Sequence, residues 1–292
     1  MFSVNSSAGL DEALDAYEKG DYKTALREFK FLSERGNANA QFRLGDMYRK
    51  GLGTIQDFKA ALLWYRKAAE NVHADAQFNL GYMYLKGDGT AQDYKAALYW
   101  YKKAAKNGHA GSQSNLGYMY VKGEGVAQDY ETARYWFEKA AANGHVGAQF
   151  NLGVIYQKGK GTVQDYKSSL LWYKKAAENG HVGAQYNLGY VYRNGKGTTQ
   201  DYKAALPWYT KAAENGHADA QYNLGLMHFR GEGTAKDYVK VHMWWNIAAS
   251  NANGHPGAHM ARDRLQKEMS SSDVLKAQDL ARECVAKAYK DC

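Results

Sequence analysis

The chain has 292 residues, 23% of them charged, and a formal net charge of +8. It contains no run of about 18 apolar residues, which excludes a membrane-spanning helix. Only two prolines, 24 tyrosines and abundant Ala, Leu and Lys are typical of an all-helical chain whose helices pack closely.

Residues 8 to 36 form a shortened copy of a longer pattern that begins at Ala38. The segment DEALDAYEKGDYKTALREFKFLSERGN keeps one helix in frame, with Asp21 and Phe29 one period before Asp57 and Tyr65. The ends of a helical array have one face without a neighbour and are expected to deviate from its pattern. We therefore predict an N-terminal capping helix pair in residues 1–36.

From Ala38 onward one sequence returns every 36 residues, and its copy at 74–108 reads ADAQFNLGYMYLKGDGTAQDYKAALYWYKKAAKNG. The same period relates six leucines and six tryptophans, namely Leu44, Leu80, Leu116, Leu152, Leu188, Leu224, Trp64, Trp100, Trp136, Trp172, Trp208 and Trp244. Six copies at this spacing indicate a stacked solenoid, whose core is built between neighbouring repeats. We place the six repeats in residues 37–251.

Each repeat predicts two helices, Ala74 to Lys86 and Tyr94 to Lys106 in the quoted copy. Gly81 lies inside the first helix at a cost of about 1 kcal/mol relative to Ala. Because this glycine recurs in all six copies, we expect it to allow close approach of the partner helix. The loop between the helices contains Thr90-x-x-Asp93, which resembles a capping signal for the second helix.

A histidine follows the Asn-Gly turn that ends each repeat. These histidines are His73, His109, His145, His181, His217 and His255. They lie a full repeat apart, beyond one coordination sphere, so a structural role in the turn is favoured over metal binding. We expect no cofactor. The lysines also come one or two per repeat, which is typical of solvated helix faces, so no nucleic-acid partner is expected.

Two irregularities mark the last part of the chain. Pro207 falls inside a second helix, where it removes a hydrogen bond and is expected to bend or shorten that helix at about 3 kcal/mol. Beyond residue 251 the pattern dissolves into two polar helices, with Ser271 or Ser272 as the N-cap. We interpret residues 252–292 as C-terminal capping helices.

The only cysteines, Cys284 and Cys292, are predicted to lie eight residues apart on one helix, about 12 Å along its axis. That separation is too long for an undistorted disulfide, so the cysteines do not decide the cellular compartment. The opening residues, MFSVNSSAGLDEAL, show no charged segment followed by an apolar core, so no secretory signal is expected in this chain.

The motif A-x-A-Q-x-N-L-G-x-M-Y-x-K-G-x-G-T-x-Q-D-Y-x-x-A-x-x-W-Y-x-K-A-A-x-N-G-H resembles the Sel-1-like repeat, a relative of the tetratricopeptide repeat. The resemblance covers residues 38–251 and, more weakly, both ends. It implies an all-α, α/α right-handed superhelical solenoid of about seven helix pairs plus C-terminal capping helices. It also implies an adaptor in protein complexes and does not imply catalysis.

The resemblance also bears on the compartment. Residues 262–282 look like the helical extension of proteobacterial members, whose mature chains open with a segment like this one after an export signal. It therefore implies a periplasmic or secreted protein whose leader is removed, with the cytoplasm as the alternative.

Comparison of the repeats with one another suggests a binding surface. In the first helix the second, fifth, ninth and twelfth positions vary, and these positions form one stripe on a helical wheel. In tetratricopeptide repeats the corresponding stripe lines the concave groove. Asparagines and basic residues run beside it, and these side chains suit a peptide backbone and carboxylates.

The predicted partner-binding residues are Asn79, Tyr82, Leu85, Lys86, Asn115, Tyr118, Lys122, Phe150, Asn151, Tyr186, Asn187, Tyr190, Arg193, Tyr222, Asn223 and Phe229. Variable aromatic side chains on an exposed face suggest protein binding. The alternative is that they complete the packing between successive first helices.

Three functions compete. The first is a non-enzymatic scaffold, expected to be a monomer, that binds an acidic or aromatic-bearing peptide or domain. The second is an immunity protein that occludes a phospholipase-type antibacterial toxin, as some Sel-1-like chains do. The third is an enzyme, for which no catalytic set lies outside the repeating scaffold. His228 and His242, which are out of register, would be its candidates.

Overall fold

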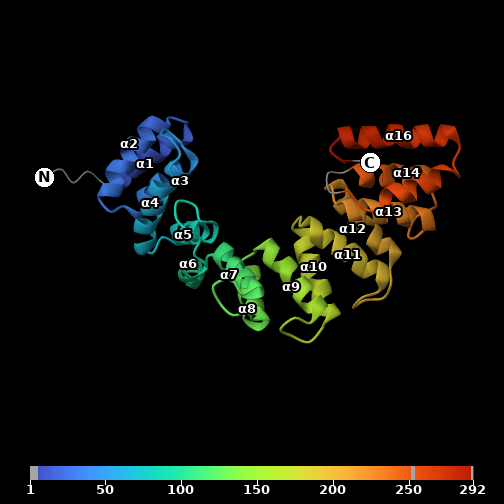
Figure 1. Cartoon of the computed structure of the whole chain (residues 1–292), viewed down its shortest axis with the longest axis horizontal. Coiled ribbons are helices and arrows are strands. Elements are labelled where there is room, and N and C mark those ends of the chain that lie inside the picture. Colours follow the sequence, from blue (N-terminus) through green and yellow to red (C-terminus); the bar gives the residue numbers. More distant parts are fainter. Residues whose placement is uncertain (1–5, 251–253, 291) are drawn as a thin grey trace. The chain divides into compact units, whose positions relative to one another are not determined.

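The computed structural model describes residues 6–250, 254–290 and 292, and over these residues the chain is helical without strands (Figure 1). The helices are α1 (Ser6–Glu18), α2 (Tyr22–Glu34), α3 (Ala38–Lys50), α4 (Phe58–Glu70), α5 (Ala74–Lys86), α6 (Tyr94–Lys106), α7 (Ala110–Lys122), α8 (Tyr130–Ala142), α9 (Val146–Lys158), α10 (Tyr166–Glu178), α11 (Val182–Asn194), α12 (Tyr202–Glu214), α13 (Ala218–Arg230), α14 (Tyr238–Ser250), α15 (Ala258–Gln266) and α16 (Ser271–Ala286).

The chain divides into two compact units, residues 1–145 and 146–292. In each unit every odd-numbered helix from α1 to α13 packs against the even-numbered helix that follows it, and α2, α4, α6, α10 and α12 pack against the next odd-numbered helix. We call the odd-numbered helices first helices and the even-numbered ones second helices. The predicted solenoid of seven helix pairs followed by capping helices is confirmed for the described residues.

Aspartates begin most of the second helices. The Oδ1 atom of Asp93 accepts hydrogen bonds from the backbone N–H groups of Lys95 and Ala96, each at 2.9 Å. Asp93 is therefore itself the N-cap of α6, and Thr90 belongs to the preceding loop. Its side chain satisfies backbone donors that have no partner inside the helix.

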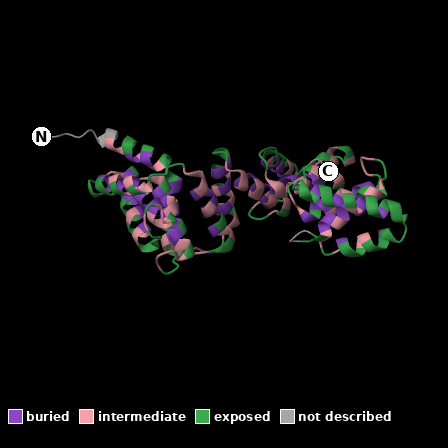
Figure 2. Cartoon of the chain, turned by 90° about the horizontal axis from the view of Figure 1, so that it is seen from above, coloured by how far each residue is buried: buried purple, intermediate pink, exposed green. Residues whose placement is uncertain are grey.

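The centre of each repeat is an aromatic ring packed on a glycine. A Cβ added to Gly81 would lie 2.8 Å from the ring of Tyr101, a residue with no exposed surface. In all six repeats a Cβ added to the equivalent glycine would lie within 3 Å of an aromatic ring. The predicted close approach of the two helices is therefore confirmed. In Figure 2, buried and exposed residues occupy opposite sides of the helices, as expected for helices that pack along one side.

A second contact joins successive repeats through amide side chains. Nε2 of Gln77 donates to the carbonyl oxygen of Ala69 at 3.0 Å, and Nδ2 of Asn107 donates to Oε1 of Gln77 at 3.4 Å. The bond to Ala69 crosses to the preceding repeat, and the Asn–Gln pair lies within one repeat and holds the glutamine in place. The same Asn–Gln pair returns at 30-residue separation in Asn71–Gln41, Asn143–Gln113, Asn179–Gln149 and Asn215–Gln185. This amide ladder satisfies polar groups that the packing of repeats removes from water.

Pro207 does not shorten its helix, so that part of the prediction was wrong. Helix α12 has 13 residues, as α10 does. The proline is exposed.

Two predictions about the C-terminal helices were wrong. The N-cap of α16 is Ser270, one residue before the expected serines, and its hydroxyl accepts the backbone N–H of Asp273 at 3.1 Å. The helix was also expected to continue to Cys292, but it ends at Ala286. Left-handed backbone at Ala288 and Tyr289, with φ of 51° and 67°, then reverses the chain.

The reversal brings the two cysteines together. Cys284 and Cys292 form a disulfide with their Cα atoms 5.4 Å apart, so the expectation that they lie too far apart on one helix was wrong. The Nζ of Lys290 then donates to Oδ1 of Asn215 at 2.9 Å, which ties the chain end to the turn before α13. Among the described helices, none is both long and apolar enough to cross a membrane.

Candidate functional site

The variable stripe of the first helices is the candidate interaction surface, and we call it the first-helix face. It comprises positions 2, 5, 9 and 12 of α3, α5 and α7 in the N-terminal unit and of α9, α11 and α13 in the C-terminal unit. Because side chains at these spacings share one side of a helix, each unit has its own set. The positions differ in how they are used.

Three tyrosines at position 9 face solvent. Tyr82, Tyr118 and Tyr190 are 42%, 43% and 38% exposed. In the N-terminal unit the Nζ of Lys86 lies 5.8 Å from the centre of the Tyr82 ring, within the range of a cation–π contact. These rings keep apolar surface in water, and each has a hydroxyl group at its tip.

The rings at position 5 are used for packing between repeats. Phe150, Tyr186 and Tyr222 stack on His181, His217 and His255, with ring centroids 4.3, 4.5 and 3.8 Å apart. Phe42 and Phe78 make the same contact with the histidine of the following repeat. For this position, packing between repeats accounts for the aromatic residues, and only part of each ring remains exposed.

The stacked histidines also begin the next helix. Nδ1 of His181 accepts the backbone N–H of Ala184 at 3.2 Å, and Nδ1 of His109 accepts that of Ser112 at 3.0 Å. Burial lowers the pKa of His181 below its ordinary value, which favours the neutral ring that this hydrogen bond needs. The predicted structural role of the turn histidines is confirmed.

The asparagines beside the stripe are half-buried, and the basic residues are exposed. Asn79, Asn115, Asn151, Asn187 and Asn223 belong to the first group. Lys50, Lys86, Lys122, Lys158 and Arg230 belong to the second. Helices α3, α5, α7, α9 and α13 thus carry an exposed cation at this position, and α11 has Asn194 there. The exposed cations therefore lie beside Tyr82 and Tyr118 in the N-terminal unit, and not beside Tyr190.

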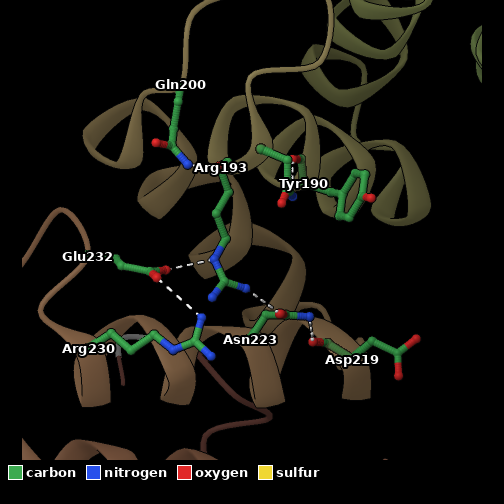
Figure 3. Close-up of polar contacts among 8 residues, drawn as sticks. Tyr190, Arg193, Gln200, Asp219, Asn223, Arg230 and Glu232 are labelled. Carbon is green, nitrogen blue, oxygen red and sulfur yellow. Dashed lines mark hydrogen bonds and ion pairs between the residues drawn. The ribbon is translucent and has the colours of Figure 1, made fainter.

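Arg193, at position 12 of α11, is held inside a polar cluster in the C-terminal unit (Figure 3). Its Nε lies 2.7 Å from Oε2 of Glu232, and a guanidinium N–H donates to Oδ1 of Asn223 at 2.8 Å. The amide of Asn223 in turn donates to the backbone oxygen of Asp219 at 2.8 Å. This cluster joins α11 to α13 and to the loop after α13.

The cluster also keeps the guanidinium of Arg193 charged. The Arg193 and Glu232 side chains are only 12% and 13% exposed. Burial by itself would lower the pKa of Arg193, but the hydrogen bond and charge of Glu232 raise it above its ordinary value. Arg193 therefore closes the surface between two repeats, with little of its guanidinium left for a partner.

In other repeats the side chain at position 12 makes polar contacts with the second helix of its own repeat. In the C-terminal unit the hydroxyl of Tyr173 donates to Oε1 of Gln157 at 2.6 Å. In the N-terminal unit Nε of Arg49 donates to the hydroxyl oxygen of Tyr65 at 3.2 Å, and that hydroxyl donates to Oδ1 of Asp46 at 2.6 Å. Burial opposes ionisation of Asp46, but hydrogen bonds from Tyr65 and its basic neighbours hold its pKa below the usual value.

An open pocket that was not predicted from the sequence lies at the C-terminal end of the first-helix face. The pocket has a volume of about 340 Å³ and is lined by Phe229, Trp245, Ala261, Arg264, Leu265 and Glu268. The signal was present in the loss of the repeat pattern beyond residue 251, which was interpreted only as capping.

The two out-of-register histidines of the enzyme alternative are buried. His228 is 8% exposed and His242 has no exposed surface, and burial lowers the pKa of both. Within the described ranges, no three His, Cys, Asp or Glu side chains are placed to hold a metal ion together.

The 36-residue pattern is decisive for the family. The Sel1 repeat matches residues 38–73, 74–109, 110–145, 146–181, 182–217 and 218–253. The chain belongs to the Sel1 repeat family. Sel1 repeat proteins are generally protein-interaction scaffolds, and their fold is typically non-enzymatic.

Solved structures of other Sel1 repeat proteins resemble this one. A Sel1 repeat protein from Oxalobacter formigenes is 32% identical, with 85% of this chain and 99% of that chain covered and a TM-score of 0.73. A protective antigen of uropathogenic Escherichia coli with an SLR fold is 26% identical, covering 97% and 78% of the two chains with a TM-score of 0.45.

An immunity protein from Pseudomonas aeruginosa is 22% identical, covering 76% of this chain and 86% of that chain with a TM-score of 0.42. A search of curated proteins gave no match.

Proposed function

We propose that this Sel1 repeat protein is a non-enzymatic scaffold that binds a protein partner on the first-helix face. The observation that carries the proposal is the exposure of Tyr82, Tyr118 and Tyr190, while the rings four positions before Tyr82 and Tyr190 stack on histidines. Exposed tyrosines supply large contact area with few rotatable bonds, which is why they are enriched in protein interfaces.

The chemistry of the partner follows from the neighbouring side chains. Lys86 and Lys122 in the N-terminal unit are exposed, each four residues after an exposed tyrosine, Tyr82 and Tyr118. Cations beside aromatic rings favour a partner segment that carries carboxylates as well as apolar side chains. We expect salt to slow the association, because rim charges act mainly on the association rate.

The test is a pull-down from the native cell with the full chain. The combined change Tyr82→Ala, Tyr118→Ala and Tyr190→Ala is expected to abolish capture of the partner while circular dichroism stays helical. The matched control is Tyr99→Ala with Tyr135→Ala, which removes rings that are 52% and 49% exposed on second helices. Capture that survives the triple change, or is lost in the control, contradicts the proposal.

A more specific form of the proposal is an immunity role, in which the same face occludes a phospholipase-type toxin. The resemblance noted from the sequence supports this form. Rescue of toxin-expressing cells by the wild-type chain, and loss of rescue in the triple tyrosine variant, is the expected result. Cells that die with either chain exclude this role for the toxin tested.

We also propose that the protein works in an oxidising compartment, the periplasm or the exterior. The disulfide between Cys284 and Cys292 supports this, because such bonds persist mainly outside the cytosol. Protein taken from cells under acid quench is expected to leave both cysteines unlabelled by a thiol reagent. Labelling of both cysteines would place the protein in the reducing cytoplasm.

A further inference from the structure

The pocket at the end of the first-helix face, which we call the terminal pocket, is built by three helices of the C-terminal unit. Phe229 comes from α13, Trp245 from α14, and Ala261, Arg264, Leu265 and Glu268 come from α15 and the residues just after it. A space of about 340 Å³ is enough to receive a large side chain of another molecule.

The terminal pocket lies where the preceding repeat has a hydrogen-bonded pair of side chains, Arg193 and Asn223, and both residues are replaced here. Phe229 lies 36 residues after Arg193 and Trp245 lies 36 after Tyr209. Ala261 lies 38 after Asn223, since the turn before α15 has two extra residues. In the earlier repeat the guanidinium of Arg193 reaches across to Oδ1 of Asn223 at 2.8 Å and joins the two helices there. With phenylalanine and alanine in their places, no such bridge forms.

The floor of the terminal pocket is apolar and buried. Trp245 is 4% and Leu265 is 3% exposed, while Phe229 is 37% exposed. The indole N–H of Trp245 donates to the backbone oxygen of Tyr222 at 3.1 Å, so its polar group is already satisfied. An apolar side chain that enters the pocket therefore displaces water without leaving a polar group of this tryptophan unpaired.

The rim carries one donor and one acceptor. Arg264 and Glu268 are exposed, and both line the pocket, Arg264 from α15 and Glu268 from the turn after it. Among the described residues, neither side chain has a hydrogen-bond or ion-pair partner. The guanidinium can donate to a carbonyl oxygen and the carboxylate can accept an amide N–H. These are the two groups that flank each side chain of an extended peptide.

We propose that the terminal pocket binds an aromatic or large aliphatic side chain of a polypeptide, with Arg264 and Glu268 holding the flanking peptide groups. This inference deepens the proposed function, because Phe229 is part of the first-helix face and the pocket supplies an anchor for the partner. A buried anchor in a well-packed pocket carries most of the affinity in many interfaces.

The experiment follows the indole N–H resonance of Trp245 in the full-length ¹⁵N-labelled protein, assigned by its loss in Trp245→Phe. The probe is N-acetyl-phenylalanine amide, and its titration is expected to shift this resonance with saturation in the millimolar range. N-acetyl-alanine amide is expected to leave the resonance in place. Ala261→Leu fills the pocket and is expected to weaken binding of the probe by at least about tenfold.

A matched variant controls for damage to α15. Met260→Leu changes the neighbouring residue of the same helix, whose side chain is 74% exposed and outside the pocket, and is expected to bind the probe as the wild type does. No shift with the phenylalanine probe, or equal shifts in Ala261→Leu and wild type, overturns the proposal. Tighter binding of free phenylalanine than of the capped probe also overturns it, because the occupant would then be an amino acid.

The outcomes for the pocket and for the proposed function are distinguishable. If Ala261→Leu blocks the probe and partner capture is lost only in the triple tyrosine variant, the first-helix face binds the partner without this anchor. If Ala261→Leu blocks both the probe and partner capture, the anchor is part of the interface. If capture survives the tyrosine changes while the probe still binds, the proposed face is wrong and the pocket stands alone.

Discussion

The mid-helix glycines set the distance between the two helices of a repeat. A Cβ at Gly81 would lie 2.8 Å from the Tyr101 ring. That ring is fully buried, so neighbouring side chains surround it and limit its movement. The helix accepts the cost of glycine because a larger residue would separate it from its partner. The same reason applies to Gly225, where the ring is the indole of Trp245.

The change Gly81→Ala is expected to destabilise the protein despite the better helix propensity of alanine. Overpacking against the Tyr101 ring costs about 1–3 kcal/mol, and alanine gains about 1 kcal/mol in helix propensity. We expect the cost of overpacking to be the larger of the two. Thermal unfolding followed by circular dichroism checks this. The control is Gly9→Ala in α1, where an added Cβ makes an ordinary contact at 3.6 Å, and where we expect a small rise in stability. A higher melting temperature for both variants would show that the ring can move aside.

The exposed tyrosines and the buried arginine show how far residue-level prediction reached. The variable stripe was visible in the sequence because six copies could be compared. The partner of Arg193 was not, because Glu232 lies 39 residues away and meets it only when two repeats stack. The rings at position 5 were likewise ambiguous, since their contact is with the histidine of the next repeat.

At the scale of elements, helix α16 is followed by a chain reversal that a disulfide closes. It packs on α14, and the reversed chain after it is fastened by the disulfide and by the contact from Lys290 to Asn215. The sequence predicted the helix but not its end. Left-handed backbone is usually predicted from a glycine, and here it occurs at Ala288 and Tyr289.

Reduction of the disulfide is expected to loosen α16 and leave the N-terminal unit unchanged. The bond closes a loop with a sequence separation of eight. Loop-closure entropy assigns such a cross-link about 2–3 kcal/mol. Hydrogen exchange measured with and without reductant is expected to show faster exchange in residues 271–290 and equal exchange in α3 to α7. Equal protection of α16 in both conditions would mean that packing on α14 alone holds this helix.

At the scale of the whole chain, the turn histidines make stability depend on pH. Burial lowers the pKa of His73, His109, His145, His181 and His217 below the ordinary value of 6.5. The unfolded chain therefore binds protons first as the pH falls below 6.5, and the folded state loses stability relative to it. Above that pH the contribution of these groups is fully present.

Denaturant unfolding between pH 8 and pH 5 is expected to show a falling midpoint, before the carboxylates begin to titrate. Asp46, whose pKa is held below 3.8, adds a second loss only at lower pH. The change His181→Asn is expected to reduce the slope, since Asn37 fills the same N-cap position in α3 and accepts the N–H of Ala40 at 3.0 Å without titrating. A slope that His181→Asn leaves unchanged would assign the pH effect to other groups.

The repeat architecture was predictable in full because one period ordered every helix from α3 to α14. The terminal pocket was not, because it depends on aligning α15 with earlier first helices across a turn lengthened by two residues. Arg193 and Asn223 are bridged by a hydrogen bond in one repeat, and Phe229 and Ala261 replace them at the end of the chain. The loss of this one bridge leaves the junction open. Such a difference appears only when side chains from three helices are seen together.

The amide ladder between repeats carries a consequence for how proteins of this kind change length. Each rung uses a glutamine and an asparagine at the same separation, together with a backbone carbonyl oxygen, as in Gln77, Asn107 and Ala69. Because both edges of a 36-residue cassette present the same rung, a duplicated or deleted cassette meets a ready-made joint on either side. Genes for such chains can therefore grow or shrink in whole modules, while the specialised end, with its pocket and disulfide, is carried along intact.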